Sequence, residues 1–179
     1  DRYRRQRQMC IRDRFYSTPE KINKALELNS KKIERMVATL FKENNLHQEY
    51  SLYANGGFGK QEMFPSSDID ISIIKNSNDI KNFDAIEKFI AKLWDSGFKI
   101  GHSVRTIKEV NQISKQDPKE FTSYLTNRPI IADQKINTKL QKTLLDKWPK
   151  KKFFKAKILE QELRHKSFCL LYTSPSPRD

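Results

Sequence analysis

The sequence predicts an α+β fold, in which a small mixed sheet with flanking helices is followed by further helices. Apolar residues recur at helical spacing over residues 19–44, and two short apolar stretches, 50–54 and 68–75, have the length of strands. Helical patterns dominate after residue 106. Strands and helices are therefore interleaved in the middle of the chain, and helices make up its second half.

The composition is that of a globular protein without a membrane segment. The chain has 179 residues, enough for one domain or for one domain and the beginning of another. No apolar run approaches the roughly 18 residues of a membrane span, and the N-terminal residues have no apolar signal-peptide core. Cys10 and Cys169 lack metal-ligand spacing. A cytoplasmic location without membrane contact is expected.

The net charge of +13 requires that a polyanionic partner be considered. Residues 1–14 contribute six arginines against two aspartates, in a segment without periodicity. Elsewhere Lys and Glu alternate along helices, as they do on solvated faces. A dispersed basic surface is therefore expected, and a nucleic-acid partner is not.

The two ends of the chain differ from the rest. Residues 5–14 and 169–179 resemble translated sequencing-adapter read-through, and they are excluded from the predicted fold. The expected organisation is a non-native or disordered leader (1–14), a core with an N-terminal helix (15–133), the start of a helical domain (134–168) and a tail (169–179).

The first helix and strand are predicted from capping and periodicity. Ser17 and Glu20 form a capping-box pattern, and Pro19 suits a first helical turn. The helix should run over about 19–44, with an apolar stripe that packs in the core. A strand over 50–54 follows.

The centre of the chain reads as a glycine turn, a short helix and a strand. The helix is expected over about 57–63 and should stop before Pro65, because the residue before proline avoids helical angles. In the strand over 68–75, Asp68 and Asp70 share one face, and the intervening isoleucines share the other.

The remaining elements follow from hydrophobic spacing and turn residues. A second long helix is expected from about Ile80 to Trp94, with Gly97 at its C-terminal cap, and a third strand over 98–106. Further helices are expected over about 107–115, 118–127, 136–147 and 151–166.

The glycine turn and the aspartates together indicate a site for a nucleoside triphosphate. Gly56, Gly57 and Gly59 let the backbone approach a ligand closely, and a helix that begins there directs N–H groups towards an anion. Two carboxylates as close as those of Asp68 and Asp70 repel each other unless a cation lies between them. Each motif alone is common, but their spacing in an apolar context favours a functional site.

Two separated motifs carry a resemblance to a known family. Residues 54–70 read ANGGFGKQEMFPSSDID, and residues 93–106 read LWDSGFKIGHSVRT. They resemble the GGYGRGEL-x-P-x-SDID and LWD…GHSVRT segments of the nucleotidyltransferase domain of PII-protein uridylyltransferases, in the DNA polymerase beta superfamily. The resemblance extends more faintly to about Phe168. It implies a polymerase-beta-like nucleotidyltransferase core.

The resemblance also implies roles for residues near the glycine turn. Gly56 and Gly57 would bind the triphosphate through the backbone, and Ser67 belongs to the same phosphate-binding group. Lys60 stands where the family has arginine, so it could meet a phosphate with less geometric control or simply be a solvated helix residue. Asp68 and Asp70 would hold Mg²⁺ and act as the catalytic carboxylates.

His102 and Arg105 are supporting candidates in the second motif. Strand alternation places them on opposite faces, so they are not expected to act as a pair. A structural role is favoured for both, although Arg105 could contact phosphate or anchor a carboxylate.

The third acidic ligand of the superfamily is not visible. The family segment Leu-Glu-x-Arg-Leu matches a stretch in which Thr126 takes the place of the glutamate. Asp117 or Glu120 could substitute. Reduced or altered catalysis is therefore one of the open alternatives.

The function implied by the resemblance is Mg²⁺-dependent transfer of UMP from UTP to a tyrosine of the PII signalling protein, in nitrogen regulation. The family's phosphohydrolase and ACT sensor regions would follow this region, and the chain is expected to end before them. Two alternatives stay open: another nucleotidyltransferase of the superfamily that acts on nucleic acid or protein, and a degenerate module that binds nucleotide without turnover.

Overall fold

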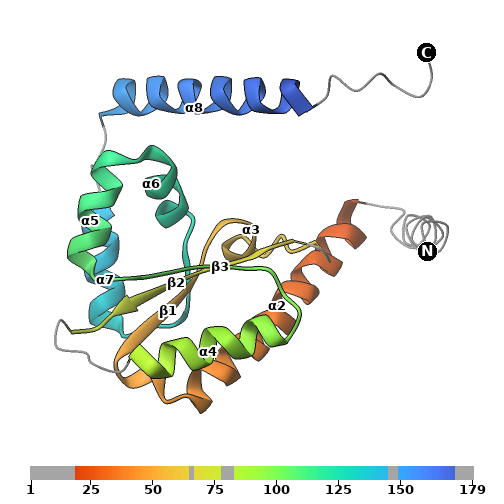
Figure 1. Cartoon of the computed structure of the whole chain (residues 1–179), viewed down its shortest axis with the longest axis vertical. Helices are drawn as coiled ribbons and strands as arrows, with labels where there is room; N and C mark the ends of the chain where they lie inside the picture. Colours follow the sequence, from red (N-terminus) through yellow and green to blue (C-terminus); the bar gives the residue numbers. More distant parts are fainter. Residues whose placement is uncertain (1–18, 65–66, 78–82, 145–148, 172–179) are drawn as a thin grey trace.

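The computed structural model describes residues 19–64, 67–77, 83–144 and 149–171, and Figure 1 shows how the elements are arranged. A single mixed sheet lies between two groups of helices. The strands are β1 (Tyr50–Ala54), β2 (Ile69–Lys75), β3 (Ile100–Arg105) and β4 (Arg128–Ile131). The helices are α2 (Pro19–Glu43), the 3-10 turn η1 (Leu46–Gln48), α3 (Gly56–Gly59), α4 (Phe83–Asp95), α5 (Ile107–Gln116), α6 (Pro118–Leu125), α7 (Gln134–Leu144) and α8 (Lys150–Leu171).

The four strands have the order β3-β2-β1-β4. β1 is antiparallel to both β2 and β4, and β2 is parallel to β3. The parallel pair requires a crossover connection, and α4 lies between the two strands in the sequence. β2, which carries Asp70, is thus an interior strand with hydrogen-bonded neighbours on both sides.

Each face of the sheet has its own apolar cluster. One contains side chains of α2 and α4 together with Leu52, Ile69, Ile71 and Ile73 of the strands. The other contains side chains of α5, α6 and α7 together with Tyr53 and Ile74. Alternation along β2 therefore buries the isoleucines preceding and following Asp70 against α2 and α4 and directs Asp70 towards the opposite face. The α+β prediction is confirmed.

Most elements lie where the sequence predicts them. The first helix, the first strand and the cap at Gly97, which has φ 78°, are confirmed. The predicted start of the second long helix at Ile80 and the cap at Ser17 lie outside the described residues. The predicted division of the chain into domains stays a prediction.

The short helix after the glycine turn is predicted wrongly. It ends at Gly59 and not near Met63, because Gln61 adopts a left-handed backbone conformation with φ 63° that no α-helix tolerates. The segment that follows is held against α2: the Asn29 side chain donates to the carbonyl of Met63 over 2.9 Å, and the Met63 N–H donates to Ser30 Oγ over 3.2 Å. The glycine turn is thereby attached to the long first helix.

Candidate active site

The glycine turn begins where β1 ends, at Asn55. The backbone N–H of Asn55 donates to the carbonyl of Asp70 over 2.9 Å, and the Asn55 carbonyl accepts from the N–H of Gly59 over 2.8 Å. Gly56 has φ 54°, a conformation that favours glycine. One residue thus links the end of β1, the turn and the aspartate strand.

The carboxylate of Asp70 lies between two glycines. A Cβ on Gly56 would come within 3.1 Å of Asp70 Oδ2, and a Cβ on Gly101 would overlap Asp70 Oδ1. Gly101 faces Asp70 directly because the two are paired in the parallel ladder of β2 and β3. The space for this carboxylate therefore exists because both neighbours lack a side chain.

The electrostatics at Asp70 favour a cation. Although Asp70 is exposed at the surface, partial desolvation of its carboxyl by the surrounding atoms raises the pKa of that group. The negative charge of Asp68 raises this pKa further, and the positive charge of Lys119 acts in the opposite direction. Asp68 lies in the segment just before β2 and is exposed. The two aspartates thus repel each other when both are ionised.

A cavity of about 270 Å³ opens beside Asp70, between the sheet and α6. Asn55, Ser72 and Ser103 form a chain of hydrogen bonds in its lining: Asn55 Nδ2 donates to Ser72 Oγ, which lies 3.1 Å from Ser103 Oγ. Asn55 Oδ1 is buried and has no partner among the described residues. The lining residues are Asn55, Asp70, Ile71, Ser72, Gly101, His102, Ser103, Lys119, Glu120 and Ser123.

Several predicted residues lie outside this lining. Gly56, Gly57, Lys60, Ser67 and Asp68 are not among the lining residues. The Lys60 side chain is exposed at the end of α3, and the backbone N–H of Ser67 donates to the carbonyl of Phe64 over 3.0 Å. Their assignment to phosphate or metal stays a prediction.

His102 and Arg105 point to opposite faces of the sheet, as alternation predicts. The His102 ring makes an edge contact with Trp94 of α4, with the ring centroids 6.0 Å apart. Arg105 Nη1 donates to Glu120 Oε2 over 2.6 Å and to the Tyr124 hydroxyl over 3.0 Å on α6. The hydrogen bond to Glu120 raises the pKa of Arg105, so its charge is permanent. Arg105 thus anchors a carboxylate.

Neither Thr126, which stands at the position of the expected acid, nor Asp117, one of the possible substitutes, lines the cavity. Thr126 is the C-terminal cap of α6, and its hydroxyl donates to carbonyls within that helix. Its own carbonyl packs against Gly59, where a Cβ would lie 2.6 Å from it. Asp117 caps the start of α6 by accepting from the Lys119 N–H over 2.7 Å. Of the acidic residues that the sequence offers as substitutes, Glu120 is the one in the lining, and it is paired with Arg105.

The donor set fits a magnesium ion that is completed by substrate. Across the described ranges, no three His, Cys, Asp or Glu side chains gather as a metal site. Asp68 and Asp70 would offer hard oxygen ligands, and the glycines beside Asp70 leave its carboxylate free of steric cover. Mg²⁺ is commonly held by one or two carboxylates together with substrate phosphates and water. Two aspartates are therefore sufficient protein ligands for such an ion.

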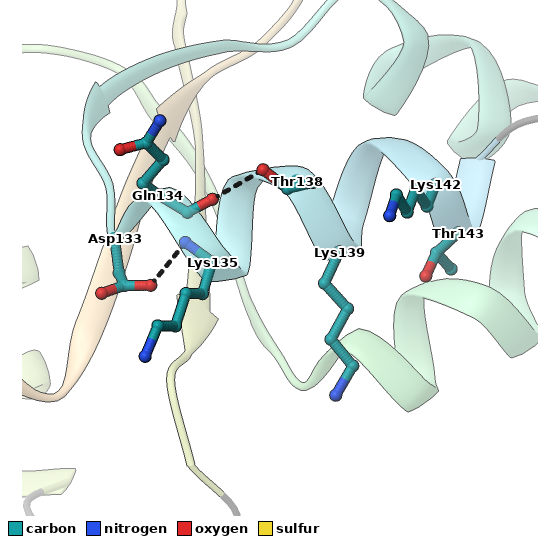
Figure 2. Close-up of a pocket in the computed structure, with 7 residues that line it drawn as sticks. All are labelled: Asp133, Gln134, Lys135, Thr138, Lys139, Lys142 and Thr143. Carbon is teal, nitrogen blue, oxygen red and sulfur yellow. Dashed lines mark hydrogen bonds between the residues drawn. The ribbon is translucent and has the colours of Figure 1, made fainter.

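A larger hollow of about 690 Å³ lies along α7 (Figure 2). Lys135 and Lys139 extend from one side of that helix, whose start is capped by Asp133 through a 2.8 Å bond from the Lys135 N–H. The lining residues are Asp133, Gln134, Lys135, Thr138, Lys139, Lys142 and Thr143. This surface is basic and contains one carboxylate, so it lacks the acidic pair of the site beside Asp70.

Sequence reasoning missed part of the site. The sequence predicts a strand over 98–106 but gives no sign that Gly101 lies against Asp70, and no local pattern marks Ser72, Ser103 or Lys119. The pairing of β2 with β3 brings Gly101, Ser72 and Ser103 together, and no local pattern encodes that register. Asn55 carried a signal, since a polar side chain at the end of a buried strand requires a partner.

The sequence comparison points to the same class as the two motifs, the nucleotidyltransferases. The particular relatives are curated proteins named bifunctional uridylyltransferase/uridylyl-removing enzyme. The chain is 35% identical to that of Pseudomonas fluorescens SBW25 over 123 residues, covering 67% of this chain and 14% of the relative. It is 36% identical to that of Haemophilus influenzae PittEE over 140 residues, covering 75% of this chain and 16% of the relative. The resemblance found in the two motifs is thus confirmed, and the chain spans about one seventh of the length of these relatives.

The solved structures that match are more distant. A toxin–antitoxin crystal structure with AMP-PNP covers 77% of this chain and 94% of its own, with 14% identity and a TM-score of 0.42. A mutant of the toxin–antitoxin pair MntA-HpeT has the same coverage and identity, with a TM-score of 0.41. No protein-family model matches the chain. In the described part of the chain, no helix combines the length and apolarity needed to cross a bilayer.

Proposed function

We propose that this domain transfers UMP from UTP to a tyrosine hydroxyl of a PII-type signalling protein and releases pyrophosphate, in a Mg²⁺-dependent reaction of nitrogen regulation. The observation that carries the proposal is the carboxylate of Asp70, seated between Gly56 and Gly101 at the edge of a cavity. The choice of UMP as the transferred group is supported by the names of the curated relatives, which are called uridylyltransferases. We also propose UTP as the donor, a PII-type protein as the acceptor and the cytoplasm as the location.

In this proposal, the residues of the chain position the reactants. The N–H groups of Gly56 and Gly57 would bind the triphosphate at the start of α3, where the first N–H groups of a helix lack partners within the helix. Asp68 and Asp70 would hold Mg²⁺, which would supply neutralisation of phosphate charge and lower the pKa of the acceptor hydroxyl. The backbone hydrogen bond from the Asn55 N–H to the Asp70 carbonyl fixes the start of the glycine turn next to the aspartate strand. Most of the acceleration comes from positioning and electrostatics.

Transfer of label tests the proposal. The chain is incubated with UTP labelled in the α-phosphate, Mg²⁺ and a PII-type protein, with Asp70→Asn as the inactive control. Label is expected on the PII-type protein with the wild-type chain only. Label on RNA in place of the protein would support a nucleotidyltransferase that acts on nucleic acid.

Thr126 favours a second candidate, a module that binds nucleotide without turnover. The position where the resemblance places an acid holds a helix cap. Magnesium-dependent binding of UTP without transfer to any acceptor would support this candidate over the enzyme. If Asp68→Asn and Asp70→Asn left magnesium-dependent UTP binding unchanged, the metal site would be wrong for both candidates.

A further inference from the structure

The cavity beside Asp70 has an unusual distribution of charge. Among the described residues that line it, Lys119 is the one lysine or arginine, and Asp70 and Glu120 are the acids. Glu120 is already paired with Arg105, with 2.6 Å between Oε2 and Nη1. Lys60, which the sequence assigns to phosphate, lies outside the lining. The lysine that lines the cavity therefore comes from α6 and not from the glycine turn.

The backbone of Lys119 is held in place, while its ammonium group forms no ion pair with the residues that the structure describes. Its N–H donates to Asp117 Oδ1 over 2.7 Å, which caps the first turn of α6. The ion pairs found among the described residues involve Lys31, Arg105, Arg128 and Lys157, and none of them includes Lys119. Its charge nevertheless acts on Asp70 across the cavity.

The charge balance of this cavity changes when a metal–nucleotide complex enters. In the free protein, one ammonium group partly offsets the negative charge at Asp70. A divalent cation held by Asp68 and Asp70 supplies that compensation itself and is repelled by Lys119. A triphosphate brings several negative charges to the same cavity, and a lysine there can form charge-assisted hydrogen bonds with them. Lys119 thus opposes the metal alone and favours the metal with a triphosphate.

We propose that Lys119 is a substrate-binding residue that is the counter-ion of Asp70 in the free domain and contacts the triphosphate when nucleotide is bound. This inference rests on the proposed function, because it takes a nucleoside triphosphate as the ligand. It assigns to α6 the phosphate-binding charge that the motif resemblance places at Lys60. The lysine thereby selects the metal–nucleotide complex over the metal alone.

Removing the charge should change two affinities in opposite directions. In Lys119→Met, binding of Mn²⁺ alone, measured by electron paramagnetic resonance of the free ion, is expected to tighten by about two- to fivefold, the range of a screened charge pair. Binding of a non-hydrolysable UTP analogue with Mg²⁺, measured by calorimetry, is expected to weaken by about tenfold or more, as for a lost charged hydrogen bond. A purely structural lysine would change both affinities in the same direction.

Matched variants complete the test. Lys119→Arg keeps the charge and should restore most of both affinities, whereas Lys115→Met removes an exposed lysine of α5 outside the lining and should leave both unchanged. Lys60→Met tests the assignment from the motif directly. Unchanged or parallel affinities in Lys119→Met would overturn the inference, as would a loss of nucleotide binding in Lys60→Met but not in Lys119→Met.

The test separates this inference from the proposed function. If the wild-type chain does not bind the UTP analogue with Mg²⁺, the proposed function fails, and the triphosphate contact fails with it. The Mn²⁺ titrations still decide whether Lys119 is the counter-ion of Asp70. If the wild type binds the analogue and Lys119→Met binds it equally well, the proposed function stands and the inference is wrong.

Discussion

Gly101 leaves room for the Asp70 carboxylate because it has no side chain. In Gly101→Ala, the new Cβ would overlap Asp70 Oδ1, the far end of a side chain that can rotate away. The fold should therefore tolerate the change, while the carboxylate is displaced from its position between the two glycines. We expect Mn²⁺ affinity to fall by about tenfold or more, as for loss of one charged ligand, with little change in melting temperature.

Gly97→Ala is the matched control for this prediction. Gly97 has φ 78° with open space around it, so alanine there strains the backbone without touching the site. It should lower stability by about 1 kcal/mol and leave Mn²⁺ affinity unchanged. A Gly101→Ala protein that binds Mn²⁺ like the wild type would show that the position of Asp70 is not critical.

Asp70 is expected to destabilise the metal-free domain at neutral pH. Its pKa is raised in the folded state, first by burial and then by Asp68, so folding favours the protonated form. Stability therefore falls as the pH rises from the ordinary aspartate pKa through the raised one, and it stays lower above that window. Asp70→Asn should raise the melting temperature at pH 7 in the presence of a chelator.

The pH and metal dependence provide the check for Asp70→Asn. The difference in melting temperature between variant and wild type should disappear below the ordinary aspartate pKa. Added Mg²⁺ should raise the melting temperature of the wild type more than that of the variant, since binding to the native state stabilises it. A variant less stable than the wild type at pH 7 without metal would contradict the prediction.

At the scale of elements, Arg128 joins three parts of the fold. Its Nε donates to the carbonyl of Gly59 over 3.1 Å, and Nη1 and Nη2 donate to the two carboxylate oxygens of Glu34 over 3.0 and 2.8 Å. β4, α2 and the glycine turn are thereby held by one guanidinium group. Lysine cannot reproduce this bidentate geometry.

Arg128→Lys should therefore cost about 1–2 kcal/mol of unfolding free energy, the range of a charged hydrogen bond that is partly exposed. Urea unfolding would measure the loss. A double-mutant cycle with Glu34→Gln isolates the part due to the ion pair, and the remainder reports the bond to Gly59. An additive cycle would show that Arg128 and Glu34 do not interact.

Elements with long periodic patterns could be predicted from the sequence. Elements that form only through pairing with a particular strand could not. The stripe of α2 and the isoleucines of β2 each encode one buried face. β4 was missed because it has four residues, contains Pro129 and follows a helix, so only its pairing with β1 makes it a strand. In the same way, the aspartates were predicted locally, whereas Gly101 and Lys119 reach Asp70 only through strand pairing and the packing of α6.

At the scale of the whole molecule, the fully buried members of both cores, among the side chains that the structure describes, lie before α8. The buried apolar clusters use residues between Ile33 and Leu144, and α8 adds Phe153, which is partly buried and makes an edge contact with Phe121 at a centroid distance of 5.7 Å. Several large side chains of α8 are exposed, including Phe154, Leu159 and Leu163. Figure 1 shows the helix extending beyond the sheet and its covering helices.

A chain that ends at residue 149 should accordingly keep cooperative urea unfolding. We expect it to lose about 0.5–1.5 kcal/mol, the range of an aromatic pair. Phe153→Ala in the full chain is the matched variant and should reproduce most of that loss. Circular dichroism should report the removal of one helix only. Broad, non-cooperative unfolding of the shorter chain would show that α8 belongs to the core.

The contact between Gly59 and Thr126 has a consequence for where this domain can accept extra residues. A Cβ on Gly59 would lie 2.6 Å from the Thr126 carbonyl and 2.9 Å from that of Ala54, and both are backbone atoms that cannot rotate away. The glycine turn is thus wedged between β1 and the connection from α6 to β4. An insertion at Thr126 or Asn127 would push directly on the turn, although these positions are distant from it in the sequence. Length variation among related domains should therefore be rare at this connection and more frequent in surface connections away from the turn.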